Sequence, residues 1–232
     1  MFTKEQVAKT IDHAVLKPDS TDADLVANAK MCIENGVFSM CVKPCDIKAA
    51  KELLKNSDVK VSCVLSFPHG ADSTPVKAFQ AKQAIEDGAD EIDMVMNISA
   101  SKRGRTDHVK RDIDAVLKQI RAKNALLKVI IEIELLSDEE IVRACNIVAD
   151  VGADFVKTSV GLLRGSKPCE VEKVKLMHDT VASKGLKVKA SGAIHTPEKF
   201  LAMIEAGASR IGTSKGIEII KGIQDNASSF DY

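Results

Sequence analysis

The sequence has few aromatic residues and no excess charge of either sign. Aromatic side chains make up 3% of the 232 residues, with no Trp and a single Tyr, and 33 basic residues balance 33 acidic ones. Nucleic-acid-binding domains usually carry a basic surface, and single-strand binders stack bases on aromatic rings. A nucleic-acid partner is therefore not expected.

The chain also lacks long apolar runs and paired cysteine motifs. No run approaches the ~20 apolar residues that a membrane helix needs, and the first residues contain no apolar core of a signal peptide. The six cysteines form no CxxC pair and no second cluster that would complete a four-ligand zinc site. We therefore expect no membrane association, no metal, and a reducing, cytoplasmic location.

Short segments rich in Val and Ile alternate with longer amphipathic segments along the whole chain. We predict strands at residues 11–16, 37–43, 59–65, 91–97, 128–133, 154–158, 187–191 and 210–213. We predict helices at 22–35, 46–55, 75–87, 107–123, 138–151, 170–184 and 197–206, and a short one near 215–221. A glycine such as Gly36 or Gly152 follows several of these helices, where it adopts the left-handed conformation that ends a helix.

This alternation predicts a single (β/α)₈ TIM barrel of the α/β class over residues 1–222, followed by a flexible tail at 223–232. An open, doubly wound sheet is the alternative. It is less favoured, because the first predicted strand is followed by Lys17-Pro18-Asp19 instead of a glycine-rich nucleotide-binding turn.

Three charged residues interrupt otherwise apolar predicted strands: Asp93, Lys157 and Lys189. Active sites of such barrels lie at the C-terminal ends of the strands. A charge that points into a packed barrel has a high desolvation free energy, so its presence there calls for a structural or functional reason. Any one of these residues could instead pair on the outer surface. Two lysines on neighbouring strands together with a carboxylate favour a functional site.

A pair of neighbouring lysines suggests amine chemistry. A free Lys has a pKa of ~10.4 and is almost fully protonated at pH 7. A second cation ~5 Å away, at an effective dielectric of ~20, disfavours the ammonium form by about 3.3 kcal/mol, and desolvation adds to this. We predict that one lysine forms a Schiff base, that the other holds it neutral, and that Asp93 moves protons.

Six sequence strings, in order from about residue 11 to 222, resemble the deoxyribose-phosphate aldolase family. They are Ile11-Asp12-His13 with Leu16-Lys17-Pro18, Phe67-Pro68-His69-Gly70, Glu91-Ile92-Asp93-Met94-Val95, Phe155-Val156-Lys157-Thr158-Ser159, Val188-Lys189-Ala190-Ser191-Gly192 and Arg210-Ile211-Gly212-Thr213-Ser214. The resemblance implies a class I aldolase that reversibly cleaves 2-deoxy-D-ribose 5-phosphate to acetaldehyde and D-glyceraldehyde 3-phosphate. It implies neither a metal nor an organic cofactor.

The resemblance also implies roles for individual residues. It assigns the Schiff-base lysine to Lys157, the lysine that lowers its pKa to Lys189, and the proton-relay aspartate to Asp93. Some family members use a C-terminal Tyr as a proton donor, and the only Tyr of this chain is its last residue, Tyr232. Two interpretations of Tyr232 stay open, because it either reaches the site or has no part in the reaction.

A phosphate site is expected after the last strands, where backbone N–H groups and a short helix hold phosphate in such barrels. The residues assigned to it are Gly161, Gly192, Ala193, Gly212, Thr213, Ser214 and Lys215. The family usually has Gly at 193 and Ser at 215, and it also differs at Ile133-Glu134. Ala193 is therefore expected to crowd the loop, and Lys215 or Arg164 to supply positive charge.

Two other functions stay open. The altered loops suggest a related Schiff-base lyase or transferase that acts on a different phosphorylated or carboxylated aldehyde, and a non-catalytic barrel could retain the lysines for packing. The oligomeric state is open between a monomer and a homo-oligomer, since an apolar helix face predicts a core and an interface equally well.

Overall fold

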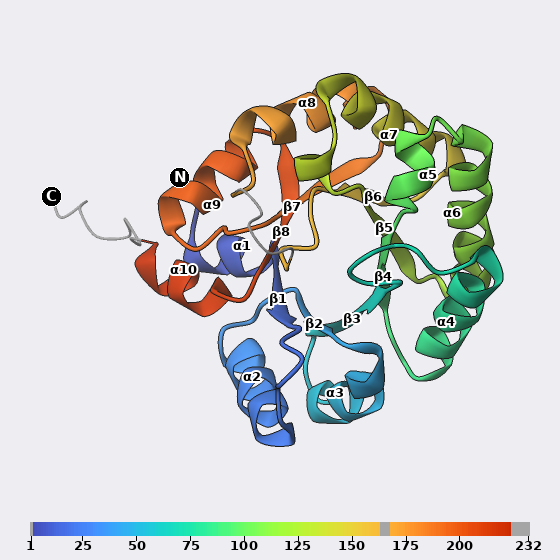
Figure 1. Cartoon of the computed structure of the whole chain (residues 1–232). Helices are drawn as coiled ribbons and strands as arrows, with labels where there is room; N and C mark the ends of the chain where they lie inside the picture. The colour runs from blue at the N-terminus through green and yellow to red at the C-terminus, as the bar shows by residue number, and fades with distance from the viewer. Residues whose placement is uncertain (1, 163–167, 224–232) are drawn as a thin grey trace, which may run out of the picture.

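The computed structural model describes residues 2–162 and 168–223, in which eight parallel strands form a closed barrel in the order β1 to β8 (Figure 1). The strands are β1 (Ile11–Val15), β2 (Ser39–Val42), β3 (Lys60–Leu65), β4 (Glu91–Val95), β5 (Leu126–Ile130), β6 (Phe155–Lys157), β7 (Lys187–Ser191) and β8 (Ala208–Thr213). The predicted (β/α)₈ barrel is confirmed, and the open sheet is wrong, because β1 pairs with β8.

Helices surround the barrel on the outside (Figure 1). They are α1 (Lys4–Ala8), α2 (Asp22–Glu34), α3 (Ile47–Leu54), α4 (Thr74–Glu86), α5 (Ile98–Lys102), α6 (Thr106–Ile120), α7 (Asp138–Val151), α8 (Val171–Val181), α9 (Pro197–Glu205) and α10 (Gly216–Gly222). None of the helices in the described ranges is long and apolar enough to cross a membrane. Of the predicted tail, only Ile223 is described, and it is buried.

Two short helices were not predicted. α1 and α5 have five residues each, too few for an apolar period to show in the sequence. Each begins at a side-chain cap, because the side chains of Thr3 and Asn97 accept the backbone N–H groups of Gln6 and Ala100. In the sequence, therefore, only the N-cap residue marked the start of each of these two helices.

The strand predicted at 128–133 is wrong at both ends. β5 begins at Leu126 and ends at Ile130. Glu132 has a left-handed backbone with φ of 58°, and a 3₁₀ turn over Ile133–Leu135 follows it. An extended strand cannot continue through a left-handed residue, so the chain leaves the barrel here and Glu132 lies just beyond the end of the strand.

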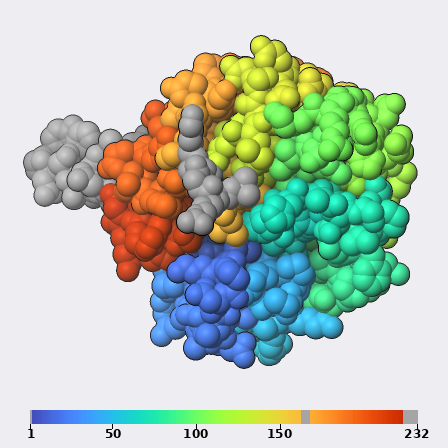
Figure 2. Space-filling view, viewed as in Figure 1, coloured from blue at the N-terminus to red at the C-terminus, as the bar shows by residue number. Residues whose placement is uncertain are grey.

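Alternate residues of each strand belong to two different compartments, as the two-residue period of a strand requires. Ile92 and Met94 of β4 belong to the main apolar core. Their neighbour Asp93, and Lys128 of β5, are equally buried but pair with each other. The barrel therefore has an apolar shell and a charged interior. In the space-filling view, segments successive in the sequence follow one another around the molecule, from the blue N-terminal part through green to the orange and red C-terminal part (Figure 2).

Candidate active site

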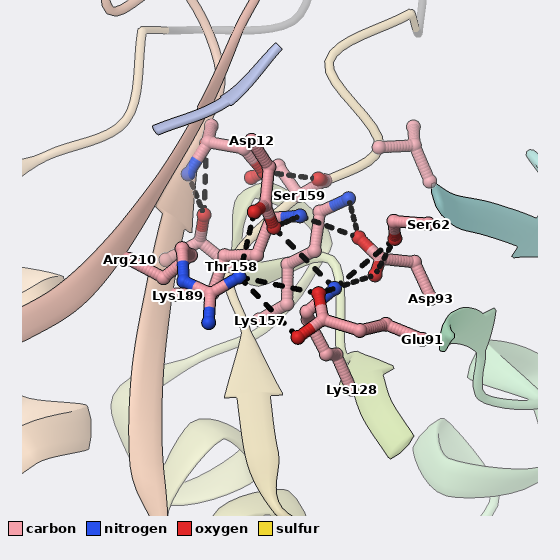
Figure 3. Close-up of polar contacts among 12 residues, drawn as sticks. Asp12, Ser62, Glu91, Asp93, Lys128, Lys157, Thr158, Ser159, Lys189 and Arg210 are labelled. Atoms are coloured by element: carbon pink, nitrogen blue, oxygen red, sulfur yellow. Dashed lines mark hydrogen bonds and ion pairs between the residues drawn. The ribbon is translucent and has the colours of Figure 1, made fainter. Parts of the chain in front are cut away.

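Seven charged side chains fill the interior of the barrel and contact one another (Figure 3). We call this set the barrel ion network; its members are Asp12, Glu91, Asp93, Lys128, Lys157, Lys189 and Arg210. Each is at most 6% exposed. Buried charges are tolerated only when they are paired, and every member of this network has an oppositely charged partner within it.

Asp93 lies at the centre of the barrel ion network and holds both predicted lysines. Its Oδ2 atom accepts hydrogen bonds from the Nζ atoms of Lys157 and Lys189, each at 2.7 Å. The two nitrogens are therefore separated by no more than twice that distance, well within the ~10 Å over which salt screens charges. The structure brings together the three residues that the sequence indicated.

The second carboxylate, Asp12 of β1, distinguishes the two lysines. It forms an ion pair with Lys189, another with Arg210 at 2.7 Å, and accepts a hydrogen bond from Ser39 at 2.6 Å. Lys189 thus has two carboxylate partners among the described residues, whereas Lys157 has only Asp93.

This difference in partners separates the two amines electrostatically. Burial lowers the pKa of Lys157; Asp93 opposes this change and Lys189 adds to it. Burial also acts to lower the pKa of Lys189, but Asp12 and Asp93 outweigh it, so the pKa of Lys189 is raised. The sequence argument ranked repulsion between lysines above desolvation. The structure reverses this order, with burial as the larger cause.

A cavity of about 580 Å³ opens beside these lysines. Lys157 and Lys189 line it, and so do all seven residues assigned to the phosphate site: Gly161, Gly192, Ala193, Gly212, Thr213, Ser214 and Lys215. The structure therefore joins the predicted amine pair and the predicted phosphate loops in one cavity. Tyr232 and Arg164 lie outside the described residues.

The loops that follow β7 and β8 contain Ala193 and Lys215, the two residues expected from the sequence to alter the phosphate site. Ala193 has a left-handed backbone with φ of 51°, a conformation that favours glycine. It is exposed in the cavity, next to Gly192. The Nζ atom of Lys215 forms an ion pair with Glu218 at 2.8 Å, so this cation already has a carboxylate partner.

One wall of the barrel mouth is apolar. Val95, Ile130 and Val160 form a separate small cluster against which Phe67 and Ile98 pack. Val160 also lines the cavity. Of this cluster, Val160 is therefore the residue that contributes an apolar surface to the cavity.

Sequence reasoning gave no role to Asp12, Glu91, Lys128, Arg210 or Glu132. Asp12 carried the same signal as Asp93, a charge within an apolar predicted strand, whereas Glu91, Lys128 and Arg210 are the first residues of their predicted strands. Glu132 is fully buried, and its Oε2 atom accepts the N–H of Val160 at 3.0 Å. Burial raises the pKa of Glu132 to about 7. Within the described residues, no group of three or more His, Cys, Asp or Glu side chains could hold a metal ion.

Comparison with known proteins identifies the family. The model described as DeoC/LacD family aldolase matches residues 6–222. The chain belongs to the DeoC/LacD family of aldolases. The family resemblance predicted from six sequence strings is thereby confirmed.

Members of this family resemble the chain over nearly its full length. The deoxyribose-phosphate aldolase of Finegoldia magna is 52% identical over 217 residues, which cover 94% of this chain and 100% of the relative. That of Thermococcus gammatolerans is 49% identical over 221 residues, covering 94% and 97%. A solved structure described as a unique tetrameric deoxyribose phosphate aldolase from Aeropyrum pernix matches with a TM-score of 0.88 and 28% identity, covering 94% of this chain and 91% of that one.

Proposed function

We propose that this chain is a class I aldolase that reversibly cleaves 2-deoxy-D-ribose 5-phosphate to acetaldehyde and D-glyceraldehyde 3-phosphate. One observation carries the proposal: the buried amine of Lys157 lines the cavity with its Nζ atom 2.7 Å from Asp93, which also holds Lys189. The relatives named above support the choice of substrate.

The first step requires Lys157 as a neutral amine. Its nitrogen attacks C1 of the open-chain sugar phosphate, and loss of water gives an iminium ion. The lowered pKa of Lys157, caused first by burial, increases the neutral fraction at neutral pH. Lys189 keeps its proton because Asp12 and Asp93 outweigh the effect of burial.

The second step breaks the C2–C3 bond. The electron pair of this bond moves toward the iminium nitrogen and forms an enamine, while the C3 hydroxyl loses its proton and C3 becomes the aldehyde carbon of glyceraldehyde 3-phosphate. We assign this proton to Asp93 acting through a water molecule, assisted by Lys189. Asp93 does not itself line the cavity, which agrees with a relay through water.

The last steps return the enzyme to its starting state. Protonation of the enamine at C2 gives the imine of acetaldehyde, and a water molecule hydrolyses this imine and frees Lys157. Tyr232 remains a proposal as the proton donor. Apart from Tyr232, the steps use only an amine, a carboxylate and water, so the proposed reaction needs neither a metal nor an organic cofactor.

The phosphate group is proposed to bind at the loops after β6, β7 and β8. These loops contribute Gly161, Gly192 and Ser214 to the same cavity, and the end of β8 contributes Gly212. Glycine allows backbone N–H groups to approach an anion closely. The left-handed Ala193 favours one second candidate, a related Schiff-base lyase for a different phosphorylated aldehyde.

We further propose that the protein acts in the cytoplasm as a homo-oligomer. All six cysteines are free thiols, which agrees with a reducing compartment. Exposed apolar side chains on α2 and α4, among them Val26, Val76 and Phe79, support assembly through the helical face. The relative from Aeropyrum pernix is described as tetrameric.

Borohydride trapping tests the proposed function. Acetaldehyde and borohydride should leave an ethyl group on Lys157, located by peptide mass mapping, and the wild type should cleave 2-deoxy-D-ribose 5-phosphate. Lys157→Met should lose both the adduct and turnover. Lys187→Met, at the exposed end of β7, is the matched control and should keep both.

Three outcomes would contradict the proposal in different ways. No adduct in the wild type at any pH would leave a non-catalytic barrel. An adduct on another lysine would reassign the Schiff base. An adduct on Lys157 without cleavage of 2-deoxy-D-ribose 5-phosphate, but with turnover of another phosphorylated acceptor aldehyde, would favour the related lyase.

A further inference from the structure

Lys128 is the most enclosed cation of the barrel ion network. It is fully buried in the middle of β5 and does not line the cavity. Its Nζ atom lies 2.6 Å from Glu91, 2.7 Å from Asp93 and 3.3 Å from Asp12, and it donates to the hydroxyl of Ser62 at 3.1 Å. No substrate in the cavity could touch this amine.

The position of Lys128 divides the two oxygen atoms of Asp93 between different partners. Oδ1 accepts from Lys128 and, at 3.1 Å, from Ser62. Oδ2 accepts from Lys157 and Lys189. Lys128 therefore fixes the rotation of the Asp93 carboxylate, so that only Oδ2 faces the two lysines of the cavity (Figure 3).

Lys128 also changes the charge balance of the interior. The barrel ion network contains four cations, namely Lys128, Lys157, Lys189 and Arg210, against the three carboxylates of Asp12, Glu91 and Asp93. One positive charge is in excess when all are ionised. Lys157 alone among the cations both lines the cavity and has a single carboxylate partner in the network, so the excess is most easily removed by deprotonating Lys157.

We propose that Lys128 is a positioning residue of the aldolase reaction, which orients Asp93 and supplies the positive charge that keeps Lys157 in its neutral, nucleophilic form. This inference rests on the proposed function, because it assumes that Lys157 is the Schiff-base lysine. Lys128 acts through Asp93 and never contacts the substrate.

The other groups that face Lys157 do not replace Lys128 in this role. Asp93 of β4 contacts Lys157 directly, and Lys189 of β7 contacts Asp93. Burial raises the pKa of Cys41 on β2, so this thiol is uncharged at neutral pH. Burial raises the pKa of Glu132 to about 7, and its titration is common to all variants compared below.

Removal of Lys128 should make Lys157 easier to protonate. In Lys128→Met the network has equal numbers of cations and carboxylates, and Asp93 has lost a counter-charge, so its attraction for the Lys157 proton increases. Asp93 stays ionised beside Lys157 and Lys189. The pH midpoint for borohydride trapping of acetaldehyde on Lys157 should rise by about one to two pH units, the effect of a unit charge several ångströms away at an effective dielectric of ~20.

Removal of a carboxylate from the same network should have the opposite effect. Glu91→Gln keeps the shape of the side chain but removes a negative charge that contacts Lys128 and Arg210. The trapping midpoint should fall by about one pH unit. The double variant, Lys128→Met with Glu91→Gln, again has one excess cation, and its midpoint should return toward the wild-type value.

Lys77 offers a matched control for the loss of a buried lysine. It is fully buried, forms an ion pair with the buried Asp112, and donates to the backbone carbonyl of Val95 at 3.1 Å. It does not line the cavity. Lys77→Met should lower the melting temperature as Lys128→Met does, but it should leave the trapping midpoint unchanged.

The experiment measures the trapping midpoint of Lys157 in wild type and the four variants, after thermal melting has shown which are folded. Opposite shifts in the two single variants and recovery in the double variant support the proposal. Unchanged midpoints in both single variants would overturn the proposal for Lys128. The proposed function would still stand in that case, provided that the wild type forms the adduct on Lys157. Absence of trapping in the wild type would instead refute the proposed function itself. If Lys128→Met does not fold, the Glu91→Gln variant tests the proposal by itself. A lower trapping midpoint in this variant would support the proposal, and an unchanged midpoint would overturn it.

Discussion

At the scale of single residues, two lysines with the same pKa in water are made different by their carboxylate partners. Both amines are buried, and burial disfavours the charge of each. Asp12 and Asp93 together keep Lys189 protonated, whereas Lys157 has Asp93 alone. The lowered pKa of Lys157 and the raised pKa of Lys189 thus differ because Asp12 contacts only Lys189 of the two.

Glu132 gives a prediction about stability at this scale. Its pKa is raised to about 7 from an ordinary value of 4.5, mainly by burial. Between these values the folded protein binds a proton that the unfolded chain has released, so this residue makes stability fall as the pH rises from about 4.5 to 7. The loss is at most roughly 3 kcal/mol.

Glu132→Gln should remove that pH-dependent loss, because glutamine can still accept the N–H of Val160 without carrying a charge. Urea unfolding of wild type and variant at pH 5 and pH 8 measures it. The variant should gain stability relative to wild type at pH 8 and not at pH 5. An equal difference at both values would mean that Glu132 does not titrate in this range.

The sequence revealed some of the ionic residues and not others for a physical reason. Asp93, Lys157 and Lys189 were recognised because each interrupts an otherwise apolar predicted strand. Lys128 gives the same signal, but the strand was predicted to begin at this residue, where an exposed side chain is ordinary. β5 actually begins at Leu126, so Lys128 is its central residue and points into the barrel.

At the scale of elements, the loop between β7 and α9 contains a strained residue next to the proposed phosphate site. Ala193 occupies a left-handed conformation, with φ of 51°, at the edge of the cavity. A side chain there carries a strain of roughly 1 kcal/mol that glycine avoids. Its methyl group also stands beside the backbone proposed to bind phosphate.

Ala193→Gly should therefore improve phosphate binding. We expect the KM for 2-deoxy-D-ribose 5-phosphate to fall about fivefold, equivalent to about 1 kcal/mol, with little change in kcat. Unphosphorylated 2-deoxy-D-ribose is the control substrate, and its kinetics should not change. Equal effects on both substrates would show that the loop does not contact the phosphate.

Helices and strands were predictable from the sequence where a periodic pattern of apolar residues or a glycine at the end of a helix marked them. The long amphipathic helices and the strand β7 agree closely with the predicted ranges. The helices α1 and α5 were missed because one turn cannot display an apolar period. The end of β5 was missed because it depends on the left-handed backbone of Glu132. The sequence Ile131-Glu132-Ile133 contains no glycine or asparagine that would predict such a conformation.

At the scale of the whole molecule, closing the barrel creates the site. Arg210 and Asp12 are separated by 198 positions in the chain, and they meet because β8 pairs with β1. The barrel ion network draws on six of the eight strands, so no local segment contains it. The alternation of strands and helices predicted the barrel, whereas the charged interior became visible only once closure had brought both ends of the sheet together.

The charged interior also explains how the fold can hold these ions. Charges in an apolar interior cost several kcal/mol each unless they are paired. Here an apolar shell excludes water from the strands, and the ions compensate one another except for one positive charge. This excess makes deprotonation of Lys157 favourable, which is the property that imine formation needs.

The most direct test of this account is the pKa of Lys157 itself. Protein labelled with ¹³C at the lysine ε-carbon can be titrated by NMR, with the Lys157 signal assigned from its absence in Lys157→Met. We predict that Lys157 titrates clearly below the ordinary value of ~10.4, while Lys128 and Lys189 remain protonated over the same range. A Lys157 midpoint at or above the ordinary value would contradict the account.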